Sequence, residues 1–247
     1  MTSGSRVAAI VLAVLVSCAG CAVNRMGDSG VTVSGETEHQ SEKVDLAQAK
    51  GSDRVSVDLD LHAGELSVDS GAKELLEADF TYNVPQWKPE VQLQKSGFRS
   101  TLSVKQGGAS ANLGDSKNRW EIKLNESVPL DFLLKCGAGE NKLRLGQFDL
   151  RSVEVHLGAG RVEIDLRGRK PTHDYAVSVH GGVGEAIIHL PNDAGIVATA
   201  SGGIGEIEVR GLEKQGGEWR RAAEGKNQST VHVDVHGGIG HILLDAR

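Results

Sequence analysis

Three stretches near the end of the chain decide the fold: YAVSVHGGVGEAII at residues 175–188, IVATASGGIGEIEV at 196–209 and VHVDVHGGIGHILL at 231–244. In each stretch, apolar and polar residues alternate up to a Gly-x-Gly corner and then resume one position out of phase. A period of two is typical of a half-buried strand, and one extra residue at a glycine indicates a bulge or sharp bend. Each stretch therefore predicts a strand bent in its middle, with both halves facing one interior.

Earlier copies of the pattern occur at residues 55–68, 130–143 and 151–164. The six copies align on the second glycine of the corner, or on the glycine of an Ala-Gly pair: Gly64, Gly139, Gly160, Gly184, Gly205 and Gly240. The residues before these glycines, including Val183, Ile204 and Ile239, form one of the apolar columns that we expect to face the interior. The repeat predicts an all-β, single-domain β-solenoid of about six glycine-cornered coils, stacked in chain order. Arg151 and Asn141 interrupt the apolar columns, and we expect them at coil ends or in half-covered positions.

Two segments fall outside the repeat. Residues 74–127 contain short alternating runs separated by Pro and Gly and predict a β-meander insertion, whereas residues 211–230 predict a loop excursion between the last two coils. These segments hold Tyr82, Trp87, Phe98, Trp120 and Trp219 in a chain with only 4% aromatic residues. Because Trp and Tyr are frequent anchors of interfaces, we hypothesise that these five residues bind a partner. The alternative is that the aromatic residues of the insertion cap the solenoid.

The N-terminus is typical of an exported protein. Arg6 precedes an apolar run from Val7 to Val16, which is too short to span a membrane. The run ends in LVSC at residues 15–18, which resembles the lipobox of bacterial lipoproteins. We predict a lipoprotein signal peptide at 1–17, a lipidated N-terminus and flexible tether at 18–53, and the solenoid domain at 54–247.

The lipid is expected on Cys18, with Cys21 as the alternative; an ordinary signal peptide with a coincidental cysteine is the other interpretation. Lipidation predicts anchoring on the extracytoplasmic face of the bacterial cell membrane or outer membrane. The third cysteine, Cys136, falls in an apolar column and is predicted to be a buried structural thiol.

Composition excludes some functions. The formal net charge of −6 argues against binding to nucleic acid, which requires a basic surface. The Gly-x-Gly corners are followed by strands, whereas phosphate-binding loops need a helix N-terminus. Carboxylates are scattered singly over many coils, so we predict no enzyme activity, no catalytic residue and no cofactor.

One outward column contains Lys135, His156, His180, Ser201 and His236. His156 and His180 lie in consecutive coils, and paired imidazoles are able to hold zinc or copper. In chain order, however, Ser201 separates His180 from His236. We therefore predict an exposed polar ladder and no metal site, with His156, His180 and His236 as the candidate ligands if a metal binds.

The sequence resembles a known family. LEADFTYNVP at 76–85, WKPE at 87–90, and LN and VPLD near 124–131 resemble the N-terminal segment of the bacterial toast-rack family. The glycine corners are also similar to the soluble domain of cell-wall-active antibiotic-response (LiaF-like) proteins and to adhesin-like β-solenoids. The resemblance covers about residues 53–247 and implies the fold, but the family has no agreed biochemical activity.

These observations predict a membrane-anchored, non-enzymatic scaffold or adhesin-like interaction module at the bacterial cell envelope. Its expected partner is an envelope protein or a cell-wall component. The alternative is an envelope-stress (antibiotic-response) sensor that modulates a membrane partner, and the third hypothesis is metal binding by the histidine column. The sequence leaves the oligomeric state open.

Overall fold

The computed structural model describes residues 35–108, 116–223 and 229–247. Contacts divide the chain into two units, Met1–Val31 and Thr32–Arg247, and all described residues belong to the second. The predicted signal peptide, Cys18 and Cys21 lie outside the described residues. Within the described ranges, no helix has the length and apolar character needed to cross a membrane.

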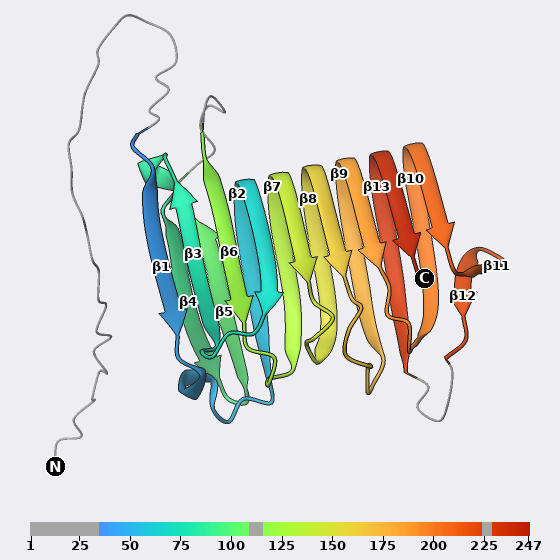
Figure 1. Ribbon diagram of the computed structural model, residues 1–247, viewed down its shortest axis with the longest axis horizontal. Coiled ribbons are helices and arrows are strands. Elements are labelled where there is room, and N and C mark those ends of the chain that lie inside the picture. The colour runs from blue at the N-terminus through green and yellow to red at the C-terminus, as the bar shows by residue number, and fades with distance from the viewer. Residues whose placement is uncertain (1–34, 109–115, 224–228) are drawn as a thin grey trace, which may run out of the picture. The chain divides into compact units, whose positions relative to one another are not determined.

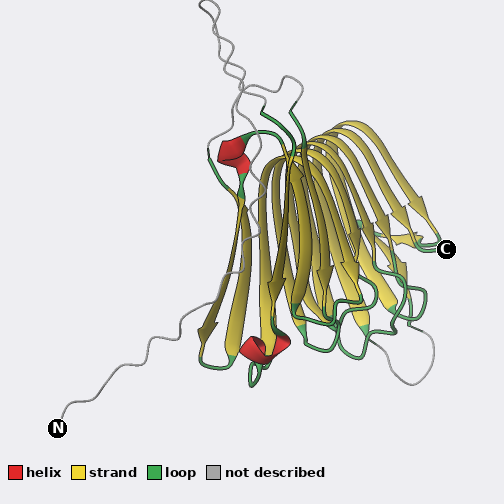
Figure 2. Ribbon diagram, turned by 60° about the vertical axis from the view of Figure 1, so that its left-hand side comes forward, coloured by secondary structure: helices red, strands yellow, loops and turns green. Residues whose placement is uncertain are grey.

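Long bent strands lie side by side in the body of the unit, as Figure 1 shows, and there are six of them among the described residues. They are β2 (Arg54–Ser70), β7 (Leu130–Arg144), β8 (Leu150–Asp165), β9 (Tyr175–His189), β10 (Gly195–Arg210) and β13 (Thr230–Asp245). Neighbouring strands pair in parallel along both halves, so each strand contributes one half to each of two facing layers. Figure 2 shows the two layers joined along one side by the bends. The prediction of an all-β solenoid is confirmed.

The bends occur at the six aligned glycines. All six have positive φ, between 120° at Gly160 and 151° at Gly139, a region that L side chains rarely adopt. A Cβ at Gly205 would overlap the carbonyl oxygen of Gly240 in the neighbouring coil, and one at Gly240 would overlap that of Gly184. The corners therefore need glycine both for backbone conformation and for the close approach of adjacent coils.

The insertion extends both layers beyond β2. Its strands are β3 (Leu76–Tyr82), β4 (Pro89–Ser96), β5 (Arg99–Gln106) and β6 (Asn118–Leu124), with a short 3-10 helix η2 (Pro85–Trp87). β5 pairs in parallel with the first half of β2 and continues to β4, whereas β6 pairs with the second half of β2 and continues to β3. The predicted meander is thus a pair of sheet extensions that lengthens the solenoid at its N-terminal end.

The predicted tether, residues 18–53, includes residues that belong to the folded unit. Residues Glu38–Val44 form strand β1, which pairs with β3, and Leu46–Ala49 form the 3-10 helix η1. β1 has little apolar character, and only Val44 among its residues is buried. An edge strand is held by backbone hydrogen bonds to one neighbour and needs few buried side chains, so its hydropathy pattern gave no signal.

The last two coils are exchanged relative to the predicted chain order. β13 pairs with β9 on one side and with β10 on the other, so the final repeat lies between the two that precede it. Chain order would place Glu185 beside Glu206, whereas the observed order places His241 between these two carboxylates. Like charges directly opposite each other on neighbouring strands are destabilising, which favours the observed order.

Both interruptions of the apolar columns have a different explanation from the one predicted. The β7–β8 register shifts between Leu130 and Asp131, so Leu150 pairs with Leu130 and Arg151 is the extra residue of a bulge. Asn141 is not half-covered: it is 1% exposed and donates a hydrogen bond from Nδ2 to the carbonyl oxygen of Arg161. This hydrogen bond satisfies the Nδ2 group of the buried amide, whereas its Oδ1 atom is buried without a hydrogen-bond partner among the described residues.

The expected interior column before the corner glycines is wrong, because none of its six residues is buried. Val183, Ile239 and Ile204 are 53%, 51% and 71% exposed, and they lie next to one another in register. The bends of β9, β13 and β10 therefore carry exposed aliphatic side chains, in contrast to the alanines of the earlier coils.

The corner geometry gives a stability prediction. The change Gly205→Val should lower the free energy of unfolding by at least about 1–3 kcal/mol, because a β-branched residue is strained at positive φ and meets the Gly240 carbonyl. Thermal unfolding followed by circular dichroism measures the effect. Gly217→Ala is the matched control, since nothing lies within 4 Å of a Cβ there. An unchanged melting temperature for Gly205→Val would contradict the assigned role of the corner.

Candidate interaction surface

The halves of the six strands before the corner glycines form the first layer, and the halves after them form the second layer. A row of histidines crosses the outer face of the first layer. In-register pairing places His156 of β8, His180 of β9 and His236 of β13 on consecutive strands. Their rings are stacked, with centroids 5.1 Å apart for His156 and His180 and 5.4 Å apart for His180 and His236. The expectation that Ser201 separates His180 from His236 is wrong, because β13 lies between β9 and β10.

Each imidazole is held by a polar group two residues earlier on its own strand. His156 Nε2 lies 2.6 Å from Glu154 Oε1, and His180 Nε2 lies 3.0 Å from Ser178 Oγ. His236 contacts Asp234 through Nε2 at 2.9 Å and Ser201 through Nδ1 at 2.7 Å. These contacts fix the orientation of three exposed rings without burying them.

Asp234 anchors the far end of the histidine row. The hydrogen bond from Thr199, at 2.5 Å, and then the contact with His236 hold the pKa of Asp234 below its ordinary value. The carboxylate therefore remains charged over a wider acidic range than a free aspartate does. The row thus presents imidazoles next to a fixed negative charge.

The rings of the histidine row are stacked and are not arranged around a common point. The three rings are nearly parallel, with interplanar angles of 13° and 7°, so their nitrogens lie side by side and do not converge on one point. Among the described residues, no group of three His, Cys, Asp or Glu side chains is arranged to hold a metal ion. The polar ladder and the metal-binding alternative both stay predictions.

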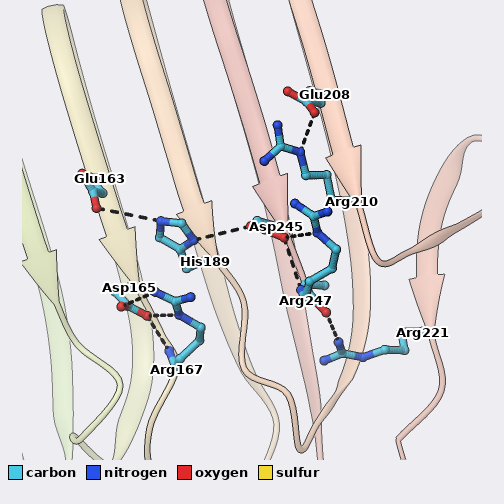
Figure 3. A network of polar contacts seen from close by, with 10 residues as sticks. Glu163, Asp165, Arg167, His189, Glu208, Arg210, Arg221, Asp245 and Arg247 are labelled. Carbon is cyan, nitrogen blue, oxygen red and sulfur yellow. Dashed lines mark hydrogen bonds and ion pairs between the residues drawn. The ribbon is translucent and has the colours of Figure 1, made fainter.

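The outer face of the second layer carries alternating charges, and Figure 3 shows the C-terminal part of this network. One row runs across the strands in the order Asp69, Arg144, Asp165, His189, Asp245 and Arg210. Arg144 contacts both carboxylate oxygens of Asp69 at 2.8 Å, and His189 lies 3.8 Å from Glu163 and 4.0 Å from Asp245. Acid and base alternate along the entire row only in the exchanged coil order.

The carboxylates of this row are further bound by arginines that follow the strands. Burial raises the pKa of Asp165, but hydrogen bonds from the side chain and backbone of Arg167 outweigh burial and leave that pKa below its ordinary value. Arg247 contacts Asp245 in the same manner at 3.1 Å. Exposed pairs of this kind contribute about 0–1 kcal/mol each, so the row determines the surface charge pattern more than stability.

Comparisons with known proteins assign the family. Residues 33–189 match the family model described as the N-terminal domain of toast_rack, DUF2154. The chain belongs to the toast-rack family. A comparison with curated proteins gave no match.

This toast-rack chain is also similar to solved structures, two of which are compared with it by identity, coverage and TM-score. A candidate cell adhesion protein from Clostridium sporogenes ATCC 15579 shares 27% identity over 85% of this chain and 99% of its own, with a TM-score of 0.79. A candidate adhesin from Bacteroides fragilis NCTC 9343 shares 9% identity over 87% of this chain and 100% of its own, with a TM-score of 0.30. The first similarity extends over nearly the whole toast-rack fold, and the second is too low to support an argument.

The five aromatic residues predicted to bind a partner differ in how far the fold exposes them. Tyr82, Trp87 and Trp120 are 2%, 2% and 0% exposed, so they offer no contact surface in this structure. Phe80 and Trp120 pack edge to face with their centroids 5.3 Å apart, which fills the end of the toast rack as the capping alternative predicts. The partner-binding hypothesis stays a prediction for Phe98, which is 72% exposed, and for Trp219, which is partly buried against the core.

Cys136 lies inside the solenoid, where it is 4% exposed. Burial raises the pKa of its thiol, although contacts with Asn141 and Ala138 partly oppose this effect. A protonated thiol at this depth is a poor nucleophile, in agreement with the predicted structural role.

Trp87 allows a test of the cap. Trp87→Ala should lower the free energy of unfolding by about 3–5 kcal/mol, and hence the melting temperature by roughly 10 °C, because a buried indole is lost. Differential scanning calorimetry provides the measurement, with the exposed Phe98→Ala as the control that leaves the transition in place. Equal melting temperatures for Trp87→Ala and the unchanged chain would argue against the cap.

Proposed function

We propose that this chain is a non-enzymatic, adhesin-like interaction module of the bacterial cell envelope. The observation that carries the proposal is the 27% identity, over 99% of its length, to a candidate cell adhesion protein with the same fold. The toast-rack body supports such a role because its two outer faces are regular arrays of exposed polar side chains on a rigid sheet. A scaffold of this kind presents a repeated polar surface to a partner.

We assign the partner contact to the outer face of the first layer. His156, His180 and His236 are held in fixed orientations there by Glu154, Ser178 and Asp234. Imidazole rings offer both apolar faces and hydrogen-bonding edges, and orienting them before binding reduces the entropy that is lost on association. The partner on this proposal is an envelope protein or cell-wall component with complementary hydrogen-bonding groups.

Capture experiments test this assignment. The full chain, carrying an affinity tag, should retain a partner from detergent-solubilised envelopes, and the triple change His156→Ala, His180→Ala and His236→Ala should abolish that retention. The matched control is Asp69→Asn with Arg144→Gln, which removes an exposed pair from the other layer. Circular dichroism establishes that both variants are folded.

The same experiment separates the two surfaces. If the triple histidine variant still captures the partner while Phe98→Ala with Trp219→Ala does not, the contact lies on the aromatic residues and our assignment is wrong. If neither variant loses the partner, both assignments are rejected.

Membrane anchoring is the second part of the proposal. The sequence LVSC at 15–18 supports lipidation at Cys18, although these residues lie outside the described structure. Cys18→Ser should move the protein from the membrane pellet to the soluble fraction, since the apolar run before it is too short to span the bilayer. Cys21→Ser serves as the control and should stay in the pellet; the reverse result would assign the lipid to Cys21.

A further inference from the structure

One edge of the solenoid, opposite the bends, holds the loops that join the coils, and Figure 1 shows this loop edge below the long strands. The turn between β4 and β5 lies on the loop edge, because Arg99 at the start of β5 pairs with Arg54 at the start of β2. Phe98 occupies that turn and is 72% exposed, more than any other large hydrophobic side chain in the described ranges. Core packing therefore does not account for an aromatic residue at this position.

Hydrogen bonds hold the β4–β5 turn in place. The carbonyl oxygen of Phe98 accepts a hydrogen bond from the Asp53 N–H at 2.8 Å. Lys95 Nζ donates a hydrogen bond to the carbonyl oxygen of Lys50 at 2.6 Å. The turn is thus bound to residues 50–53, the segment that follows η1, and it presents the phenyl ring on a fixed backbone.

Cations lie around the exposed ring, in a chain whose formal net charge is −6. Lys50, Lys95 and Arg99 lie within the turn or against it, and none of them forms an ion pair with another described residue. Arg99 also lies directly opposite Arg54 on the neighbouring strand, and like charges in this arrangement cost stability. A local charge arrangement that costs stability is typical of a site that binds the opposite charge.

The carboxylates near the turn do not cancel this positive charge. Asp131 neutralises Arg54, with 3.3 Å between its carboxylate and the guanidinium. Asp45 lies at the opposite end of η1 from Lys50, where it caps that helix. Beside the phenyl ring itself, three unpaired cations therefore accompany one exposed carboxylate, that of Asp53.

We propose that the β4–β5 turn binds the surface of an anionic lipid bilayer. Phe98 enters the boundary between head groups and acyl chains, and the three cations lie among the phosphates of the head groups. A phenyl ring flanked by Lys and Arg suits such a surface, because burial of the ring and electrostatic attraction act together there. The contact turns the loop edge toward the bilayer and the bends away from it.

The proposed contact is weak by itself and gains strength when the chain is already held at the membrane. The 16 residues between Cys18, the proposed lipid attachment, and Gly35 span up to roughly 55 Å when extended. β1 starts at the level of the bends and reaches the loop edge after seven residues, about 23 Å. A chain anchored at Cys18 is therefore long enough for the loop edge to face the bilayer.

Fluorescence quenching by vesicles tests the contact in the full chain. Phe98→Trp places an indole at the turn, and brominated acyl chains quench an indole that enters the bilayer. Quenching should be several-fold stronger with phosphatidylglycerol than with phosphatidylcholine vesicles, and about 1 M salt should remove the difference by screening the charges. The unchanged chain gives the background of its own tryptophans. Quenching is a better measurement than co-sedimentation, because the N-terminal apolar run is able to attach the chain to either vesicle.

Charge variants test the role of the cations. Lys95→Gln with Arg99→Gln, added to Phe98→Trp, should lower the quenching by phosphatidylglycerol vesicles to the phosphatidylcholine level. Lys135→Gln with Lys142→Gln is the matched control, since it removes the same charge from exposed positions on β7, away from the loop edge. This control should be quenched like Phe98→Trp alone, and circular dichroism establishes that all variants are folded.

A placement control uses the turn between β11 (Glu213–Gln215) and β12 (Glu218–Arg221), where a Cβ at Gly217 has open space. Gly217→Trp should not be quenched beyond the background. Equal quenching by the two lipids, equal quenching of Gly217→Trp and Phe98→Trp, or undiminished quenching after the two Gln changes would each overturn the proposal. Loss of a captured envelope protein by Phe98→Ala, with no quenching by either vesicle, would assign the turn to a protein partner instead.

Discussion

The close approach of glycine backbones at the corners is the constraint on which the structure depends. Six strands bend at the same level and stay paired in register on both sides of the bend, which brings the Cα of one corner against the carbonyl oxygen of the next. No side chain fits into that contact, and the positive φ of each corner excludes β-branched residues independently. Because the bends are aligned, both layers stay in register, and the apolar side chains of the two halves face each other along the whole stack.

The repeat made the fold predictable because its signal is local and periodic. Alternation around Gly184, Gly205 and Gly240 revealed strands, bends and interior positions without any knowledge of tertiary contacts. The features that the repeat did not predict depend on non-local pairing. β1 is held by backbone pairing with β3, and Arg151 is the extra residue of a bulge where the β7–β8 register shifts. The exchange of β10 and β13 was nevertheless present in the sequence. Ala198 and Ala200 are smaller than Val233 and Val235 at the matching positions, as suits the last of the six coils, and the row from Asp69 to Arg210 alternates in charge only in the exchanged order.

The surface was less predictable than the fold. The sequence identified the histidine column but placed Ser201 within it, because which strand neighbours which is a property of the entire sheet. The aromatic residues were found in the sequence but assigned to the surface, whereas Trp87 and Trp120 are buried. Composition does not distinguish an aromatic cap from an aromatic binding surface. The small residues at the inward positions of the last coils were also visible as Gly-Gly-Val-Gly and Gly-Gly-Ile-Gly in place of Leu-Gly-Ala-Gly, once those positions were known.

The position of β13 has a consequence for how the chain reaches its native state. During synthesis β9 and β10 emerge before β13, and two consecutive repeats joined by a short loop readily pair with each other. In the native order this pairing is absent, because the last strand separates them. Any early β9–β10 ladder is therefore a kinetic trap that must open before β13 inserts. The last three coils therefore reach their native pairing only once β13 is available to insert between β9 and β10.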